Sequence, residues 1–200
     1  MDQALQKKLI EAIATTVIAH ADELTRLDQQ IGDGDHGLNM KRGFDAVLAD
    51  IDNLAAKSLP EAAKAIGTTL VMKVGGASGP LYGTLFLALA KALPADGEPV
   101  ATARAFADAV EAVKARGKSQ EGQKTLLDVL VPVGTEFAAG GDRLAARVKA
   151  RAFAAADGTV AMKAARGRAS FLGERSIGHM DPGARSASLM IAAVCDVVGG

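Results

Sequence analysis

Hydrophobic residues recur every three or four positions along most of this 200-residue chain. Near the start, Leu5, Leu9 and Ile13 fall one helical turn apart, which is the spacing of an amphipathic α-helix. The valine-rich stretches at 71–74 and 129–133 lie inside helical patterns and show no strand-like alternation. The pattern predicts an all-α single domain over residues 1–200, with eight helices at Gln3–Leu27, Leu38–Leu54, Leu59–Val74, Pro80–Leu93, Val100–Arg116, Gln123–Ala139, Asp142–Arg166 and Pro182–Val198.

Capping signals mark two of these helix starts. Ser58 and Glu61 lie three residues apart and bracket Pro60, as in a capping box. Asp181 precedes Pro182, a pair typical of an N-cap and the first helical position. The predicted helix at Pro80–Leu93 is apolar on nearly every face, so we expect it to lie at the centre of the bundle.

Composition argues against several classes of function. The net charge is zero, which gives no electrostatic basis for binding nucleic acid or an anionic membrane. Aromatic residues make up 4 % and Trp is missing, so a base-stacking surface is not expected. We find no signal segment and no run of about 20 apolar residues that would span a membrane. The single cysteine, Cys195, is expected to be a buried thiol, and the prediction is a cytoplasmic protein.

The stretch IGDGDHG at residues 31–37 has the glycine spacing of a dinucleotide-binding turn but not its context. Such a turn follows a strand, whereas the residues before this one have helical periodicity. A P-loop would need Lys and then Ser or Thr where Leu38 and Asn39 stand. An EF-hand beginning at Asp33 would need Gly at Leu38 and Glu at Phe44. These three motifs therefore leave the aspartates of the stretch unexplained.

Three carboxylates gather around this loop. Asp33 and Asp35 lie two residues apart within it, and Asp28 closes the preceding helix about one turn earlier. Crowded carboxylates repel one another unless a cation neutralises them, and their hard oxygens suit Mg²⁺ or Ca²⁺. The loop is thus a candidate Mg²⁺ site in which the glycines let the carboxylates converge. The other interpretation is a solvated turn, since Asp–Gly is common in turns for local reasons.

A second loop, Gly75–Gly79, suits an anion. It brings small residues, backbone N–H groups and the hydroxyl of Ser78 to the start of a helix, where phosphate binds favourably. A tight turn between closely packed helices explains the same residues without a ligand. An acidic loop for metal and a glycine loop for phosphate form the combination that a Mg²⁺–nucleotide site needs.

A third loop supplies cations. Arg166, Arg168 and Arg175 can pair with phosphate or stack on a base, although solvated surface arginines are the simpler interpretation for at least two of them. His179 and Asp181 are candidates for catalysis, or alternatively a turn histidine and a helix cap.

Four segments carry a family resemblance. They read LDQQIGDGDHGLNMKRGF, VGGASGPLYGTLF, ARGKSQEGQKTLLDVLVP and GRASFLGERSIGHMDPGA, and they follow one another between Leu27 and Ala184. Together they resemble the nucleotide-binding L subunit of the dihydroxyacetone kinase family, the DAK2 domain. The resemblance implies an eight-helix barrel with the nucleotide site at one end.

The resemblance also implies ligands for particular residues. Asp28, Asp33 and Asp35 would bind two Mg²⁺ ions that bridge to the phosphates of ADP or ATP. The other implied nucleotide-site residues are His36, Asn39, Gly76, Ala77, Ser78, Gly79, Gly117, Leu126, Arg168, Asp181, Pro182 and Gly183. Leu126 is often Met in relatives, and either side chain would pack on an adenine face.

In this family, the ketone substrate dihydroxyacetone sits on a separate K subunit or domain, so the chain needs no nucleophile of its own. The resemblance implies phosphoryl transfer with ADP as a fixed cofactor, rephosphorylated by a phosphohistidine-carrying M subunit of the phosphotransferase system. Free exchange of ATP is the second mode. Other interpretations are a kinase subunit for another ketose such as erythrulose, and a nucleotide-loaded regulatory subunit. Relatives form dimers or larger assemblies, so a homodimer is a further expected partner.

Overall fold

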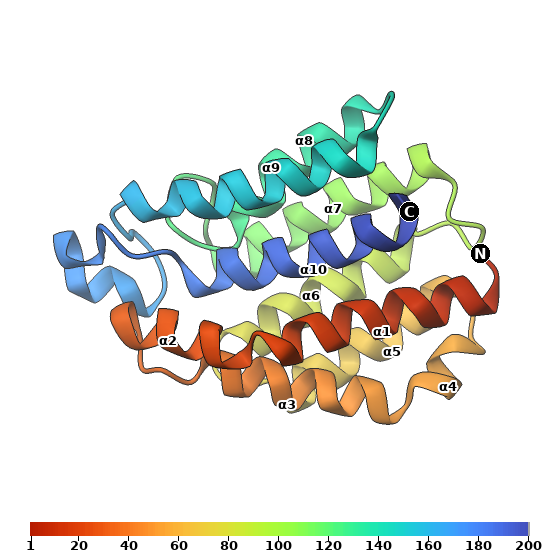
Figure 1. The fold of residues 1–200 in the computed structure, drawn as a ribbon, viewed down its shortest axis with the longest axis horizontal. Helices are drawn as coiled ribbons and strands as arrows, with labels where there is room; N and C mark the ends of the chain where they lie inside the picture. The colour runs from red at the N-terminus through yellow and green to blue at the C-terminus, as the bar shows by residue number, and fades with distance from the viewer. Residues whose placement is uncertain (200) are drawn as a thin grey trace.

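The computed structural model describes residues 1–199, which fold into helices joined by loops (Figure 1). The long helices are α1 (Gln3–Ala19), α2 (Ala21–Ile31), α3 (His36–Ala49), α5 (Leu59–Lys73), α6 (Ser78–Ala92), α7 (Pro99–Gly117), α8 (Leu127–Ala139), α9 (Leu144–Gly158) and α10 (Pro182–Gly199). The short elements are α4 (Ile51–Ala55) and the 3₁₀ segments η1 (Thr159–Ala161) and η2 (Arg168–Ser176). Residues 1–199 contain no β-strand, which confirms the predicted all-α class.

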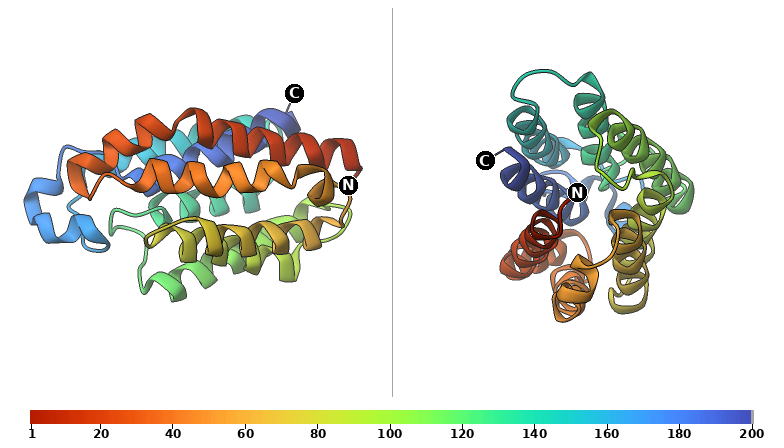
Figure 2. Two further views of the ribbon diagram at one scale, coloured as in Figure 1. Left: turned by 90° about the horizontal axis from the view of Figure 1, so that it is seen from below. Right: turned by 90° about the vertical axis from the view of Figure 1, so that its right-hand side faces the viewer.

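The long helices form a closed ring, seen end-on in Figure 2. α1 and α2 both pack on α3 and together make one side of the ring. From α3 the order runs through α5, α6, α7, α8 and α9 to α10, with each helix packed on the next. α10 then packs against α1 and closes the ring. With α1 and α2 counted as one side, the described part of the chain has eight sides, in agreement with the predicted eight-helix barrel.

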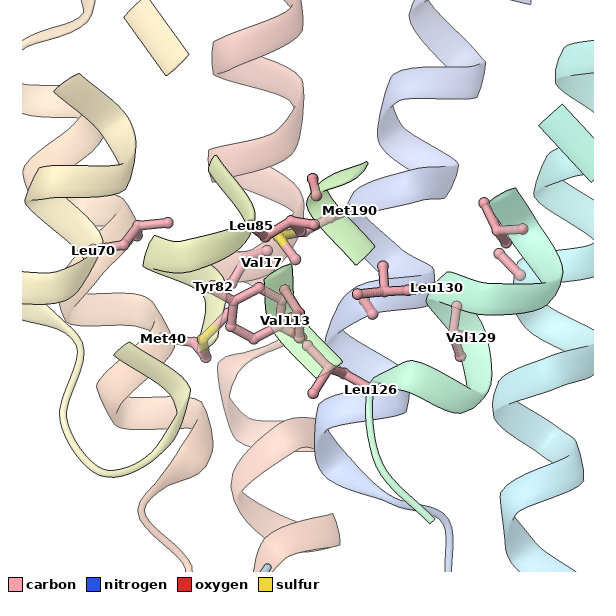
Figure 3. Close-up of a cluster of buried hydrophobic side chains, with 14 of the residues drawn as sticks. Val17, Met40, Leu70, Tyr82, Leu85, Val113, Leu126, Val129, Leu130 and Met190 are labelled. Atoms are coloured by element: carbon pink, nitrogen blue, oxygen red, sulfur yellow. The ribbon is translucent and has the colours of Figure 1, made fainter. Parts of the chain in front are cut away.

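The core lies inside this ring. Figure 3 shows part of it, where apolar side chains from seven helices and the residue before α8 point toward one another. Those labelled are Val17, Met40, Leu70, Tyr82, Leu85, Val113, Leu126, Val129, Leu130 and Met190. Burial of an aliphatic side chain is worth about 1.5–3 kcal/mol, so this shared interior is the main force that closes the ring.

Two predicted helices are broken in the structure. The helix expected at Gln3–Leu27 is interrupted at His20, and the one at Leu38–Leu54 is interrupted at Asp50. His20 and Asp50 leave helical geometry with ψ near 10° and 15°. The apolar spacing continues across both breaks because the flanking helices bury the same face, so the spacing could not reveal them.

Two other boundaries are also corrected. The helix predicted from Gln123 begins at Leu127, because the Asp128 carboxylate accepts N–H bonds from Gly122 and Thr125 and holds the preceding residues in a loop. The helix predicted to run to Arg166 ends at Gly158 and continues as η1.

The predicted capping signals are confirmed, whereas the predicted place of one helix is wrong. The Ser58 hydroxyl accepts from the Glu61 N–H, and the Glu61 carboxylate accepts from the Ser58 N–H. Asp181 Oδ2 accepts from the Ala184 N–H at 2.7 Å, as expected of an N-cap. The helix expected at the centre, α6, instead lies in the wall between α5 and α7, which cover much of its apolar outer surface.

The two ends of the barrel differ in character. Toward the end that holds the termini, an apolar cavity of about 590 Å³ is lined by side chains of α1 and of α5 to α10, including the buried thiol of Cys195. The loops α2–α3, α5–α6 and η2–α10 lie at the opposite end (Figure 1). Among residues 1–199 no helix is long and apolar enough to cross a membrane.

Candidate nucleotide and metal site

The acidic loop between α2 and α3 brings its three carboxylates together. Asp28 lies in the last turn of α2, Asp33 lies in the loop, and Asp35 is the N-cap residue of α3. Each offers one oxygen such that all three oxygens lie within 4.8 Å of one another. The Asp35 carboxylate makes no capping hydrogen bond, so it is available to a ligand. This convergence of hard oxygens fits a divalent cation such as Mg²⁺.

Asp28 organises the loop as well as contributing an oxygen. Its Oδ2 accepts N–H bonds from Asp35 at 2.9 Å and His36 at 3.2 Å. A Cβ on Gly32 would lie 2.0 Å from Asp28 Oδ1, so glycine is required at position 32 for this carboxylate to stand where it does. Burial raises the pKa of Asp28, the two N–H bonds oppose that rise, and the charges of Asp33 and Asp35 add to it. A bound cation would relieve both the burial and the repulsion.

Arg168 reaches the acidic loop from η2. Its Nη2 lies 2.9 Å from Asp33 Oδ2, and its side chain is 68 % exposed. An ion pair this exposed contributes about 0–1 kcal/mol, so a ligand can displace or share it at small cost. The predicted role of Arg168 at the nucleotide stays a prediction, but the structure does bring the residue to the carboxylate cluster.

The glycine loop between α5 and α6 ends in an uncapped helix start. Ala77 is the N-cap residue of α6 and has no side chain that accepts the first N–H groups. The next residues, Ser78 and Gly79, carry backbone N–H groups, whereas Pro80 has none. Gly76 has φ of +63°, a left-handed conformation that favours glycine. A helix N-terminus without a cap attracts an anion, which fits the predicted phosphate contact.

Asn39 joins the acidic loop to the glycine loop. Its Oδ1 accepts from Arg42 Nη2 at 2.9 Å, and Arg42 Nε donates to the Lys73 carbonyl at 2.7 Å. With its oxygen occupied in this way, the amide Nδ2 of Asn39 faces Gly76. Asn39 therefore presents a donor toward the predicted phosphate site.

His36 makes the second connection between the same two loops. Its Nδ1 lies 3.0 Å from Ser78 Oγ and its Nε2 lies 2.9 Å from Ser186 Oγ in α10. The residue is 7 % exposed, and burial lowers the pKa of its imidazole to about 4. His36 is thus a neutral, fully engaged side chain at this site, and its predicted contact with nucleotide stays a prediction.

The turn before α10 forms a third side of the site. Asp181 is buried, and burial raises the pKa of its carboxyl to about 7, with the Ala184 N–H bond opposing the rise. Gly183 stands against Leu126, which is 5 % exposed and part of the core cluster. Gly117, at the end of α7, packs near Leu81 of α6. The predicted pocket residues of four separate segments therefore gather at one end of the barrel.

Lys124 holds this region together and was missed from the sequence. It is 1 % exposed, and its Nζ donates to the carbonyls of Met162, Ser176 and His179 at 3.0, 2.6 and 2.6 Å. Burial lowers the pKa of Lys124, and Asp181 opposes this. A buried ammonium that satisfies three carbonyls fixes the η2 segment against the loop before α8.

Arg42 and Ser186 also have site contacts that no sequence pattern indicated. Tyr82 did carry a signal, since a tyrosine within an apolar helix needs a partner for its hydroxyl when buried. That partner is Ser186, whose Oγ lies 2.6 Å from Tyr82 Oη. The pairing joins residues 104 positions apart, so no local pattern could reveal it.

The family model of the DAK2 domain matches residues 30–196 of the chain. The chain is 43 % identical over 179 residues to the ADP-binding subunit DhaL of a PEP-dependent dihydroxyacetone kinase from Escherichia coli (strain K12), covering 86 % of this chain and 85 % of that one. It is 41 % identical over 179 residues to the ADP-binding subunit DhaL of a PTS-dependent dihydroxyacetone kinase from Lactococcus lactis, covering 88 % and 87 % of the two chains.

Larger proteins match over one part of their length. Human triokinase/FMN cyclase is 32 % identical over 197 residues, which is 95 % of this chain and 34 % of that protein. The crystal structure of the native dihydroxyacetone kinase of C. freundii aligns with a TM-score of 0.80 at 25 % identity, over 96 % of this chain and 34 % of that one. A structure of the C. freundii enzyme with AMP-PNP and Mg²⁺ aligns with a TM-score of 0.79, and at 24 % identity that likeness concerns the fold.

Proposed function

Because this chain belongs to the DAK2 domain family, which includes the ADP-binding subunits of dihydroxyacetone kinases, we propose that it is such a subunit and works in phosphoryl transfer to dihydroxyacetone. The observation that carries the proposal is the convergence of the Asp28, Asp33 and Asp35 oxygens beside an uncapped helix start. A cluster for cations and a helix end for anions, side by side, suit a metal–nucleotide.

The carboxylates fit Mg²⁺ by their chemistry and by the space that Gly32 leaves for Asp28. We infer that Asp28, Asp33 and Asp35 hold two Mg²⁺ ions, which when bound would neutralise charge on the nucleotide phosphates. Asp28 also fixes the loop through its two N–H bonds, so the site is pre-arranged before the ligand enters. Arg168 would exchange part of its contact with Asp33 for the nucleotide.

The backbone between Gly76 and Gly79 would receive the phosphates, with the donor of Asn39 beside it. The turn Asp181–Gly183, Leu126 and Gly117 would line the remainder of the nucleotide pocket. None of these groups is a nucleophile, and the acceptor hydroxyl would belong to dihydroxyacetone on a separate K subunit. The chain's task is to bind and orient the nucleotide and to stabilise charge during transfer.

We propose that ADP is a fixed cofactor, rephosphorylated by a phosphohistidine-carrying M subunit. The E. coli and L. lactis relatives support this mode, because they are named ADP-binding subunits of PEP-dependent and PTS-dependent kinases. In this mode, ADP should stay with the purified protein through gel filtration in Mg²⁺ buffer. Rapid loss of ADP would instead support free exchange with ATP. The homodimer stays a prediction.

The test is reconstitution. The chain is mixed with a dihydroxyacetone-binding K subunit and Mg²⁺. The phosphoryl donor is either ATP or a phosphoenolpyruvate-driven phosphotransferase system with its M subunit. Dihydroxyacetone phosphate is then measured with a coupled dehydrogenase. We expect product that depends on every component and, in the first mode, on phosphoenolpyruvate. Replacing dihydroxyacetone by erythrulose in the same assay tests the alternative substrate. Absence of dihydroxyacetone phosphate under both donors, with a K subunit shown to bind dihydroxyacetone, would overturn the proposal.

A further inference from the structure

Four side chains form a continuous buried hydrogen-bond chain across the barrel end. It runs from Ser78 Oγ to His36 Nδ1 (3.0 Å), from His36 Nε2 to Ser186 Oγ (2.9 Å), and from Ser186 Oγ to Tyr82 Oη (2.6 Å). Both Tyr82 and Ser186 also face the carbonyl of Gly183, at 2.9 and 3.1 Å. The chain thus connects α6, α3 and α10 at the three loops that make the site.

The chain is closed to water along most of its length. His36 is 7 % exposed, Tyr82 is 1 % exposed and Ser186 is fully buried, while Ser78 lies half-buried at the start of α6. Protons within it therefore have to be shared among these four groups and the Gly183 carbonyl. A neutral imidazole donates from one nitrogen and accepts at the other, which leaves two ways to order the protons.

In the first order, the Ser78 hydroxyl donates to Nδ1, Nε2–H donates to Ser186, and the remaining protons point toward Gly183. Ser78 then shows only lone pairs to a ligand, and lone pairs repel phosphate oxygens.

In the second order, both hydrogen bonds of the imidazole are reversed. Tyr82 donates to Ser186, Ser186 donates to Nε2, and Nδ1–H donates to Ser78 Oγ. The hydroxyl hydrogen of Ser78 is then released to point out of the chain, at the uncapped start of α6. The second order is the one that offers a hydroxyl donor to a bound phosphate.

We propose that His36 is a positioning residue: its Nδ1–H holds Ser78 Oγ so that the Ser78 hydroxyl donates to a phosphate oxygen of the nucleotide, with Ser186 and Tyr82 fixing the imidazole behind it. This inference rests on the proposed nucleotide function. It assigns His36 to Ser78 and gives the imidazole no direct contact with nucleotide. In the complex with Mg–ADP, the imidazole proton therefore lies on Nδ1.

Two amide substitutions of His36 distinguish this positioning role from a packing role. The amide of His36→Asn stands as many bonds from Cα as Nδ1 and keeps a donor for Ser78. The amide of His36→Gln stands as far out as Nε2, so it meets Ser186 and leaves Ser78 without its partner. Calorimetric titration with Mg–ADP should give His36→Asn within about threefold of the natural affinity and His36→Gln about tenfold weaker, which corresponds to about 1.4 kcal/mol.

A double-mutant cycle with Ser78→Ala tests whether His36 acts through the hydroxyl. In the Ser78→Ala background, His36→Gln should change the affinity by less than twofold. A full tenfold loss there, or equal losses in the Asn and Gln variants, would overturn the role of His36. Thermal melts report whether each variant is folded at the titration temperature.

Nitrogen-15 NMR of histidine-labelled protein reads the tautomer directly, with the His36→Asn spectrum identifying the His36 signals among those of the three histidines. In the complex with Mg–ADP, the Nδ1 signal of His36 should be of the protonated type. An unprotonated Nδ1 in protein shown to bind Mg–ADP overturns the His36 role alone. Failure of the natural protein to bind Mg–ADP at all overturns the proposed function and this inference with it.

Discussion

Replacing Gly32 by alanine is the sharpest structural test of the acidic loop. The added Cβ would stand 2.0 Å from Asp28 Oδ1 and 2.9 Å from its Cγ, so the Asp28 carboxylate has to leave its place. Leaving costs two hydrogen bonds, those from the N–H groups of Asp35 and His36. It also removes one of the three oxygens that lie within 4.8 Å of one another.

The size of the effect follows from those contacts. A hydrogen bond to a charged group contributes about 1.5–3 kcal/mol, and water can replace part of it because the loop is half-exposed. We therefore expect Gly32→Ala to lower the free energy of unfolding by about 2–3 kcal/mol. For a chain of this size each kcal/mol shifts Tm by about 2–4 °C, so Tm should fall by about 4–12 °C. Affinity for Mg–ADP should fall by about a hundredfold, at the upper end of the losses seen around metal sites.

The assay pairs thermal unfolding with calorimetric titration of Mg–ADP. Gly158→Ala is the matched control, because an added Cβ there meets no atom within 4 Å and the residue ends α9 with φ of −57°. That variant should bind normally and be as stable as the natural protein or up to about 1 kcal/mol more stable. Natural affinity and natural Tm in Gly32→Ala would refute the reasoning about Asp28.

Two further predictions concern the region beside the site. Lys124→Met should lower the free energy of unfolding, measured in urea, by about 3–5 kcal/mol, because three carbonyls lose a buried ammonium. The control Lys8→Met, at an exposed lysine, should change it by about 0.5 kcal/mol or less. A loss below about 1 kcal/mol for Lys124→Met would contradict the role of Lys124. Asp181 has its pKa raised by burial from 3.8 to about 7, so the folded state keeps a proton that the unfolded state has lost. The stability this proton contributes is full below about pH 4 and is lost as pH rises to about 7, so the natural protein should lose stability relative to Asp181→Asn between pH 4 and 7. A difference that stays flat over that range would show that Asp181 is ionised throughout.

The helices were predictable where the signal was local. The capping box of Ser58 and Glu61 and the N-cap at Asp181 depend on neighbours within three residues, and both are present. The break at His20 was not predictable, since the apolar face continues through it. The place of α6 in the wall was misjudged, because close packing by α5 and α7 covers an outer face that would otherwise be exposed to water.

The residues of the site likewise divide into those with a local sequence signal and those with long-range contacts only. The convergence of Asp28, Asp33 and Asp35 followed from sequence spacing, and Gly32 has the permissive role expected of the glycines. Lys124 could not be foreseen, because a lysine in a polar loop is ordinarily solvated and its three carbonyl partners lie 38 to 55 residues away. The contact between His36 and Ser186 spans 150 residues, so it depends on closure of the ring by α10.

The central claim is that the acidic cluster holds the metal that binds nucleotide, and one titration tests it most directly. ADP is titrated by calorimetry into the natural protein, Asp33→Asn and Asp108→Asn, each in Mg²⁺ and again in EDTA. Asp108 is an exposed residue of α7 for which the structure shows no ion pair in residues 1–199, so it controls for loss of one negative charge. We predict binding in Mg²⁺ for the natural protein and Asp108→Asn, little binding for Asp33→Asn, and little for any of them in EDTA. Equal ADP affinity of Asp33→Asn and the natural protein in Mg²⁺ would contradict the account.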